Sequence, residues 1–242
     1  MYALYIKELR SFLNSLIGYL TILFFIISIG IWMWVFPGSG NVLDMGEASL
    51  RVLFTNAPIV FLFLIPAITM RSLAEENRTG TIELLLTQPI TDTAIILAKY
   101  FASVTLVFLA LLPTLIYYYS VVELGDPKGN IDHAGTLGAY FGLFLLGAVF
   151  VSIGIFASAL TKNQVISFLI AILLSFTVYI GFQFMATTLS APFDYLFINL
   201  SIQEHYMGMQ KGVIDSRDLI YYLSVITLFI VLTKMVMQSR KW

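Results

Sequence analysis

The sequence contains no cysteine and only two histidines. The missing cysteines exclude disulfide bonds, cysteine-based zinc sites and thiol nucleophiles among its 242 residues. His133 and His205 are far apart in predicted loops and form no His-Glu-x-x-His motif, so both are interpreted as loop residues. The chain has no Gly-Lys pair, hence no phosphate-binding P-loop, and no Gly-x-Ser-x-Gly nucleophile motif. The sequence therefore predicts no catalytic, cofactor or metal site.

Charge is also scarce, and long hydrophobic runs take its place. Charged residues make up 11% of the chain and hydrophobic residues 59%, with a mean hydropathy of +0.91. Soluble domains are only about 45–50% apolar. Six runs approach the roughly 20 residues that cross a bilayer core: 16–36, 52–70, 94–119, 137–160, 165–185 and 219–237. They lack the alternation of barrel strands. We expect an all-α polytopic membrane protein with six transmembrane helices, forming a single domain over residues 1–242.

The first 15 residues predict a separate helix rather than a cleavable signal peptide. Three charged residues interrupt the apolar pattern that a signal peptide needs: Lys7, Glu8 and Arg10. Apolar residues recur at spacings of three and four: Tyr2, Ile6, Leu9 and Leu13. This pattern predicts an interfacial helix that lies on the membrane before the first span. A simple extension of that span is the alternative interpretation.

The distribution of basic residues predicts the orientation. With six spans, nine of the 13 Lys and Arg residues fall on the side that carries both termini. Both termini are therefore expected to be cytoplasmic. The spans contain no acidic residue in their interiors, and Lys99 and Lys234 are close enough to span ends to extend their ammonium groups into water. These features disfavour an ion-coupled carrier and indicate that any energy comes from a partner.

A charged segment at residues 71–93 separates the second and third spans. Its first part, RSLAEENR, predicts a helical extension of the second span, with Arg71 and Glu75 four residues apart on one face. Thr79-Gly80-Thr81 then interrupts the helix, and residues 82–87 predict a short apolar helix that ends before Pro89. A short helix held across the membrane surface is typical of helix-in-groove recognition.

The capping signals around this segment are also visible. Glu83 falls near the positive N-terminal end of the short helix, and Thr91 is interpreted as an N-cap for the next helix, with Asp92 in its first turn.

Small residues in the fourth span, Gly147, Gly154 and Ser158, predict close helix packing, either within the chain or between subunits.

The segment 186–218 is long but rich in aromatic and aliphatic residues, which predicts short outer helices between the fifth and sixth spans rather than a flexible loop. Asp215 precedes the last apolar run and is interpreted first as a helix cap. A role in gating or in contact with an outer partner is the alternative.

The stretch from Pro66 to Leu86, PAITMRSLAEENRTGTIELLL, resembles the hallmark of type-2 ABC transporter permeases, an E-E-R-x-x-G-T-x-E-x-L-L-like segment after the second span. The match departs at Asn77, which intervenes before Arg78. The six predicted spans and the sequence KELRSF, which starts at Lys7, also agree with this family. The outer His205-Tyr206 pair and the KGVIDSRD run from Lys211 are similar to one subgroup, the gliding-motility-associated GldF-type permeases.

This resemblance implies a membrane subunit that binds no cofactor itself. A separate pair of ABC ATPase subunits would bind ATP and magnesium, and a second permease half, identical or related, would complete the transporter in the bacterial inner membrane. It places ATPase coupling in the segment after the second span: Glu75, Glu76, Arg78, Gly80, Thr81, Glu83 and Leu84. It also implies that the interfacial helix, with Lys7, Glu8 and Arg10, contacts the ATPase subunit. The similarity to the GldF-type subgroup indicates further candidate site residues in the outer segment: His205, Gly212, Asp215, Arg217 and Asp218.

Two functions remain open at this stage. The first is a transporter subunit, expected to belong to an exporter, that uses ATP hydrolysed by another chain, in gliding motility or an associated secretion process. The second is a membrane anchor that transmits ATPase-driven conformational work to an outer or periplasmic partner without transport. For the charged coupling residues, ordinary surface charges are the simpler alternative. Neither the substrate nor the identity of the second half follows from the sequence, and no feature indicates nucleic-acid binding.

Overall fold

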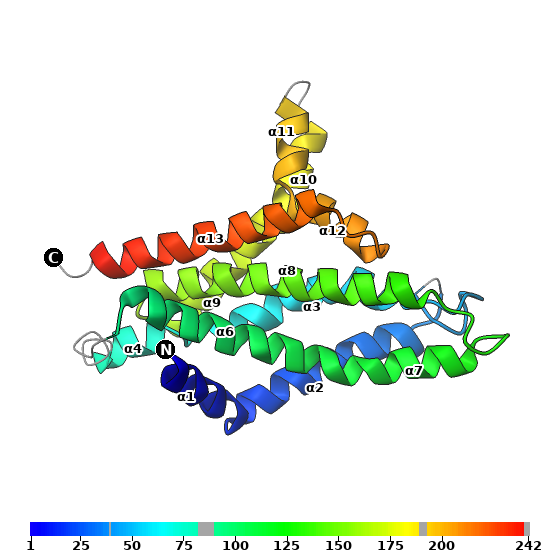
Figure 1. Ribbon diagram of the computed structural model, residues 1–242, viewed down its shortest axis with the longest axis horizontal. Coiled ribbons are helices and arrows are strands. Elements are labelled where there is room, and N and C mark those ends of the chain that lie inside the picture. The colour runs from blue at the N-terminus through cyan, green and yellow to red at the C-terminus, as the bar shows by residue number, and fades with distance from the viewer. Residues whose placement is uncertain (39, 82–89, 189–192, 240–242) are drawn as a thin grey trace.

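The computed structural model describes residues 1–38, 40–81, 90–188 and 193–239, and its regular structure there is entirely helical. Figure 1 shows the elements in chain order. They are α1 (Tyr2–Leu13), α2 (Leu16–Trp34), α3 (Arg51–Thr69), α4 (Ala74–Thr79), α6 (Asp92–Leu111), η1 (Leu112–Thr114), α7 (Leu115–Leu124), α8 (His133–Leu160), α9 (Gln164–Phe176), η2 (Thr177–Gly181), α10 (Phe182–Thr188), α11 (Phe193–Leu200), α12 (Ile202–Gln210) and α13 (Ser216–Ser239).

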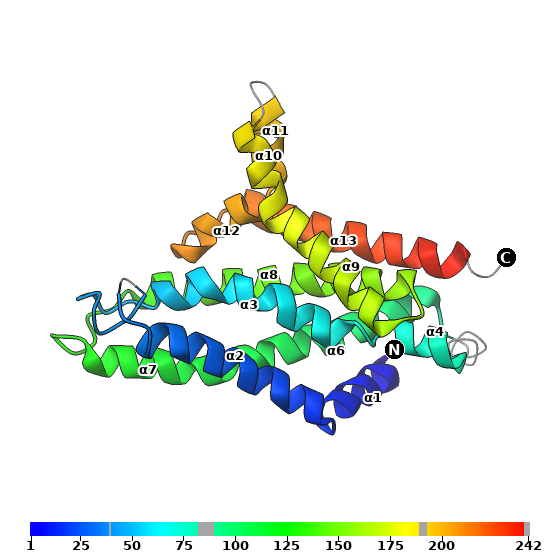
Figure 2. The ribbon, with the colours of Figure 1, turned by 180° about the vertical axis from the view of Figure 1, so that it is seen from behind.

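Helix α8 lies at the centre of the bundle, and α3, α6, α9 and α13 pack around it (Figures 1 and 2). The most apolar part of α8 is 78% buried, against 22% for the α9 span and for α13. A Cβ added to Gly147 would lie 2.7 Å from Cγ1 of Val107 on α6, so this glycine permits a close approach. Lipid supplies no hydrophobic force between helices, and such close contacts hold spans together. The small residues of α8 therefore serve packing within the chain.

The all-helical membrane class is confirmed. Five helical stretches are long and apolar enough to cross a bilayer: Arg51–Thr79, Asp92–Leu124, His133–Leu160, Gln164–Thr188 and Ser216–Ser239. A sixth is obtained when the pair formed by α1 and α2, bent by 63°, is taken as one broken span. The described residues thus contain five or six candidate spans, in agreement with the expected architecture.

The bend between α1 and α2 has a local cause. The side chain of Ser15 caps α2 by accepting a hydrogen bond from the backbone N–H of Gly18, 3.3 Å away, and donates to the carbonyl of Phe12. A Cβ at Gly18 would overlap that same carbonyl, so only glycine fits there. α1 is consequently a helix of its own, as the sequence predicts for the interfacial segment.

Two of these candidate spans contain an irregular turn. Pro113 has no backbone N–H, and the Asp92–Leu124 span passes through the 3-10 turn η1 at this position before it continues as α7. The Gln164–Thr188 span contains the π-helical turn η2 between α9 and α10. Beyond it, α10 and α11 form a hairpin that projects from the side of the bundle (Figure 2). α11 and α12 confirm the prediction of short helices after the fifth span.

The two ends of the bundle differ. One end, called the basic end here, carries α1, α4, the start of α6 and the end of α13 (Figure 1). Lys7, Arg71, Arg78 and Lys99 meet there around one pocket. The opposite end, called the loop end, carries α7, the loop before α3, the loop before α8 and the last turn of α12.

Candidate functional site

A buried lysine joins three helices at the basic end. Nζ of Lys99 on α6 lies 3.1 Å from Oε1 of Glu8 on α1 and 2.7 Å from Oε1 of Glu76 on α4. The Lys99 side chain is only 2% exposed, and the two glutamates are 14% and 13% exposed. Removing one partner from such a buried group leaves an uncompensated charge, which is far more costly than losing a surface ion pair. Glu8, Glu76 and Lys99 are called the buried triad below.

The buried triad corrects one sequence-based expectation. Lys99 was expected to extend its ammonium group into water, but it points into the protein and is paired there. The reason is that α1 covers this face of α6. Leu4 of α1 packs on Ile95 and Ala98, and the hydroxyl of Tyr5 hydrogen-bonds that of Thr105, 3.0 Å away.

The turn between α3 and α4 is held by the central helix. Oγ of Ser158 on α8 accepts hydrogen bonds from the backbone N–H groups of Leu73 and Ala74, each at 2.9 Å, and donates to the carbonyl of Met70. One hydroxyl therefore satisfies the backbone groups left free where α3 ends and α4 begins. One helical turn earlier, Gly154 faces Thr69 so closely that a Cβ would overlap its hydroxyl. α4 is thus anchored to the core of the bundle rather than suspended from α3.

This turn also explains why one predicted ion pair is absent. Arg71 and Glu75 were expected on one face of a continuous helix, but α3 ends at Thr69 and α4 begins at Ala74. Glu75 instead accepts from Arg78, at 2.6 Å, and from the side-chain amide of Gln164 at the start of α9. Glu75 and Arg78 are therefore part of a contact between α4 and α9 at the basic end.

The segment after α4 follows its sequence signals as far as the structure describes it. Gly80 ends α4 in the left-handed conformation, at φ +73°, which favours glycine. The hydroxyls of Thr79 and Thr81 hydrogen-bond each other at 2.9 Å. Thr91 caps α6 through the N–H of Ala94, as predicted. The predicted short helix at 82–87, with Glu83 and Leu84, lies outside the described residues.

A pocket of about 500 Å³ opens beside the buried triad. Its lining combines α1, the α3–α4 turn, α4, α6 and the start of α9. Lys7 and Arg71 contribute exposed cations to it. Arg10 lies in the last turn of α1 and is exposed, but it does not line this pocket. The structure therefore brings Lys7, Glu8, Glu75, Glu76 and Arg78 together around one hollow.

The predicted outer residues form a second cluster. Nδ1 of His205 lies 2.7 Å from Oδ1 of Asp218, and its Nε2 lies 3.0 Å from the carbonyl oxygen of Asn199. The ring stacks on Tyr221 with a centroid separation of 3.9 Å. These contacts join α11, α12 and α13. Because both ring nitrogens face acceptors, both bonds form together only with the doubly protonated imidazole.

The remaining predicted outer residues, Gly212, Asp215 and Arg217, lie at the turn between α12 and α13 and at the start of α13. Gly212, at φ +81°, turns the chain between α12 and α13 and lies so close to Gly135 that a Cβ would overlap it. The carboxylate of Asp215 accepts from the backbone N–H of Arg217 at 2.9 Å, which agrees with its interpretation as a cap of α13. The side chain of Arg217 is exposed.

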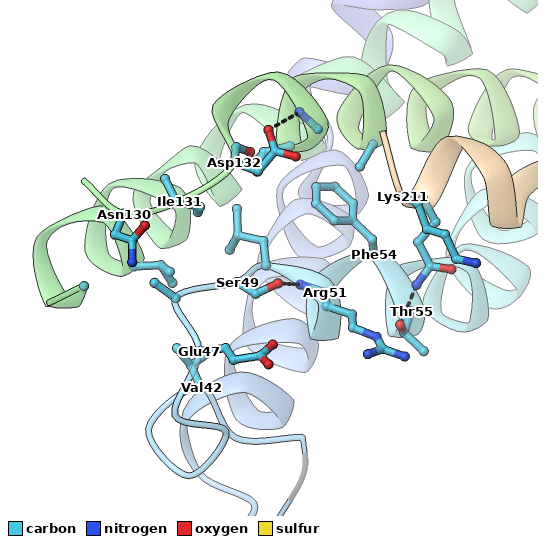
Figure 3. Close-up of a pocket in the computed structure, with 18 of the residues that line it drawn as sticks. Val42, Glu47, Ser49, Arg51, Phe54, Thr55, Asn130, Ile131, Asp132 and Lys211 are labelled. Carbon is cyan, nitrogen blue, oxygen red and sulfur yellow. Dashed lines mark hydrogen bonds between the residues drawn. The ribbon is translucent and has the colours of Figure 1, made fainter. Parts of the chain in front are cut away.

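A larger cavity, of about 1190 Å³, lies at the loop end (Figure 3). It is bounded by the loop before α3, the start of α3, the loop between α7 and α8, the start of α8 and the end of α12. Tyr206 lines it, and its hydroxyl donates to the carbonyl of Phe54 at 2.8 Å. Burial raises the pKa of Tyr206 well above its usual value, so this hydroxyl stays a hydrogen-bond donor. No single stretch of the sequence indicates this cavity.

Within residues 1–38, 40–81, 90–188 and 193–239, no group of three or more His, Asp or Glu residues is arranged to hold a metal ion. The described residues form a polytopic helical bundle with an open cavity at each end. The sequence model of the family described as ABC-2 family transporter protein matches residues 2–240. The chain therefore belongs to the ABC-2 transporter family, whose permease domain is the membrane component of an ABC transporter. A search of curated proteins finds no match.

Proposed function

We propose that the chain couples ATP hydrolysis by a separate ATPase subunit to helix movement in an ABC exporter, and that the basic end is where the ATPase docks. The observation that carries this proposal is the buried triad. It ties α1, α4 and α6 together through Lys99, while Ser158 ties the same turn to α8. A displacement of the segment after α4 is therefore passed to the second, third and fourth spans.

The exposed part of this end supplies the docking surface in the proposal. Arg78, Thr79, Gly80 and Thr81 are exposed, whereas Asn77 and Ala74 on the same helix are buried. An exposed stretch on a firmly anchored helix suits rigid transmission, because little of the applied movement is lost in bending. Both termini are placed in the cytoplasm in this proposal, and the second permease half and the gliding-type assignment also remain part of it.

The test is copurification under mild extraction. We expect an ABC ATPase to copurify with the wild-type chain and to be lost with Arg78→Glu. Lys128→Glu is the matched control, since Lys128 is also an exposed cation paired with a glutamate, at 3.0 Å from Glu123, but at the loop end. Retention of the ATPase by Arg78→Glu, or its absence from wild type, would contradict the proposed docking surface.

The membrane-anchor alternative is separated by a second measurement. The complex of the chain and its ATPase is reconstituted in vesicles and supplied with ATP. If ATP hydrolysis moves a substrate across the membrane, the transporter function is supported. If ATP hydrolysis moves no substrate but changes the binding of a partner at the loop end, transmission of conformational work is favoured.

A further inference from the structure

Two side chains from neighbouring helices cap the C-terminal end of α11. The last carbonyls of a helix have no partner within the helix itself. Here Nε2 of His205 on α12 lies 3.0 Å from the carbonyl oxygen of Asn199, and the hydroxyl of Tyr221 on α13 donates to the carbonyl of Leu200. The two rings stack on each other, so they act on the end of α11 as one unit.

This capped end is where the α10–α11 hairpin joins the rest of the protein. α11 ends at Leu200 and α12 begins at Ile202. α10 and α11 pack chiefly on each other, and the hairpin projects away from the bundle (Figures 1 and 2). Between the two helices, Oγ of Ser201 donates to the carbonyl of Tyr179 at 3.2 Å. The contacts at residues 199–201 therefore determine how firmly the hairpin is held.

Of the groups at this joint, the imidazole of His205 is the one whose bonding depends on its protonation. Its Nδ1 lies 2.7 Å from Oδ1 of Asp218. The carboxylate of Asp218 and the carbonyl of Asn199 both accept hydrogen bonds, whereas a neutral imidazole has a single N–H to donate. A neutral ring therefore bonds one acceptor and turns a lone pair toward the other. The complete set of contacts requires the imidazolium, which the C-terminal end of a helix also favours.

The other charged and titratable groups around α12 leave His205 to these partners. Its ring contacts are with Asp218 and Tyr221 of α13, and the neighbouring Glu204 on α12 is exposed. The elements α3, α8, η2 and α13 pack on α12. Among the described residues, no hydrogen bond, ion pair or ring contact joins His205 to the remaining titratable side chains of these elements near the joint: Arg51, His133, Tyr140, Tyr179, Arg217 and Tyr222.

We propose that His205 is a pH-sensitive switch that controls how firmly the α10–α11 hairpin is held. At acidic pH the imidazolium bridges Asp218 and the carbonyl of Asn199, and it fixes the end of α11 to α12 and α13. As the pH rises through the range in which histidine loses its charge, one of these two bonds is lost. Serine and tyrosine hydroxyls keep their protons over this range, so the contacts of Ser201 and Tyr221 then hold the joint alone. The inference goes beyond the proposed function, since it concerns the outer segment and requires no ATPase.

The test measures the position of the hairpin directly. Because the chain has no cysteine, two introduced cysteines can be spin-labelled without background. Tyr195→Cys on α11 and Phe63→Cys on α3 are suitable sites, with side chains 69% and 53% exposed. Double electron–electron resonance on the purified full-length protein gives the distribution of label distances at about pH 5.0 and about pH 8.5, on the two sides of the histidine range. We expect a narrow distribution at the lower pH and a broader one at the higher pH.

His133→Gln is the matched control, because His133 is the other histidine of the chain and contacts Tyr118 at the start of α8. The control should broaden with pH as wild type does, whereas His205→Gln should give the same width at both pH values. Asp218→Asn should move the midpoint of the broadening to lower pH, because it removes the negative charge that favours the imidazolium.

Each variant is first shown to keep the elution volume and thermal transition of the labelled wild type. Equal widths at both pH values in wild type would overturn the proposal. So would broadening that persists in His205→Gln, or broadening that is lost in His133→Gln.

Discussion

Lys99 and Glu76, 23 residues apart in the sequence, form a 2.7 Å ion pair in the interior of the basic end. Glu8 completes the arrangement from the other side, 3.1 Å from the same nitrogen. One ammonium group therefore pairs with two carboxylates that belong to different helices. Oε2 of Glu76 is buried and has no hydrogen-bond partner among the residues described, which makes the lysine all the more important to this site.

Lys99→Met is predicted to destabilise the protein strongly, because both glutamates would keep their burial and lose their cation. The expected loss in the free energy of unfolding is on the order of 3–5 kcal/mol. Thermal unfolding in detergent would measure it. The triple variant Glu8→Gln/Glu76→Gln/Lys99→Met removes all three charges and should regain most of the loss. A Lys99→Met protein as stable as wild type would show that the triad does not hold these helices together.

Ser158→Ala is predicted to loosen the α3–α4 turn, since two buried N–H groups lose their acceptor. The expected cost is about 1–3 kcal/mol. Ser152→Ala is the matched control on the same helix, because its buried hydroxyl bonds only to the carbonyl of Val149 within α8. Hydrogen exchange at residues 70–79 should rise in the first variant and stay unchanged in the second. Equal increases in exchange in the two variants would show that Ser158 stabilises helix α8 rather than the α3–α4 turn.

Gly154→Ala is predicted to push α3 away from α8. The new Cβ would overlap the hydroxyl of Thr69 and lie 2.9 Å from its Cβ. Overpacking of this kind costs about 1–3 kcal/mol. At Gly208, by contrast, the nearest atom to a new Cβ is 3.6 Å away, so Gly208→Ala should be neutral or stabilising. Adding Thr69→Ala to Gly154→Ala should restore part of the loss in a thermal-unfolding assay, and no recovery would argue against this contact.

His205 and Asp218 are predicted to be energetically coupled. A double-mutant cycle with His205→Gln and Asp218→Asn should give a coupling of about 0.5–3 kcal/mol in unfolding free energy, as for residues in one hydrogen-bond network. Strict additivity of the two single variants would mean that the 2.7 Å contact adds nothing to the joint between α12 and α13.

Features with local signals could be predicted from the sequence. The spans follow from apolar runs, the end of α4 from Gly80, and the start of α6 from Thr91, because each depends on a few neighbouring residues. The predicted pairing of Arg71 with Glu75 was wrong because Glu75 pairs with Arg78 and with Gln164 of α9 instead, and the contact with α9 could not be anticipated from neighbouring residues.

Features that depend on tertiary contacts could not be predicted. The burial of Lys99 depends on α1 folding back over α6, and nothing near Lys99 in the sequence indicates this. The role of Ser158 depends on which side of α8 faces the end of α3. The loop-end cavity is assembled from four separate segments, residues 42–55, residues 121–139, Tyr179 and residues 203–211, so no single stretch carries its signature. In each case the candidate site lies where distant helices meet.

The separation of 91 positions between Glu8 and Lys99 also bears on how the protein is made. Glu8 is synthesised well before the lysine with which it pairs, and α2 and α3 lie between them in the sequence. The contact between α1 and α6 can therefore form only after α2 and α3 have been made, so the docking of α1 follows its own synthesis by two further helices.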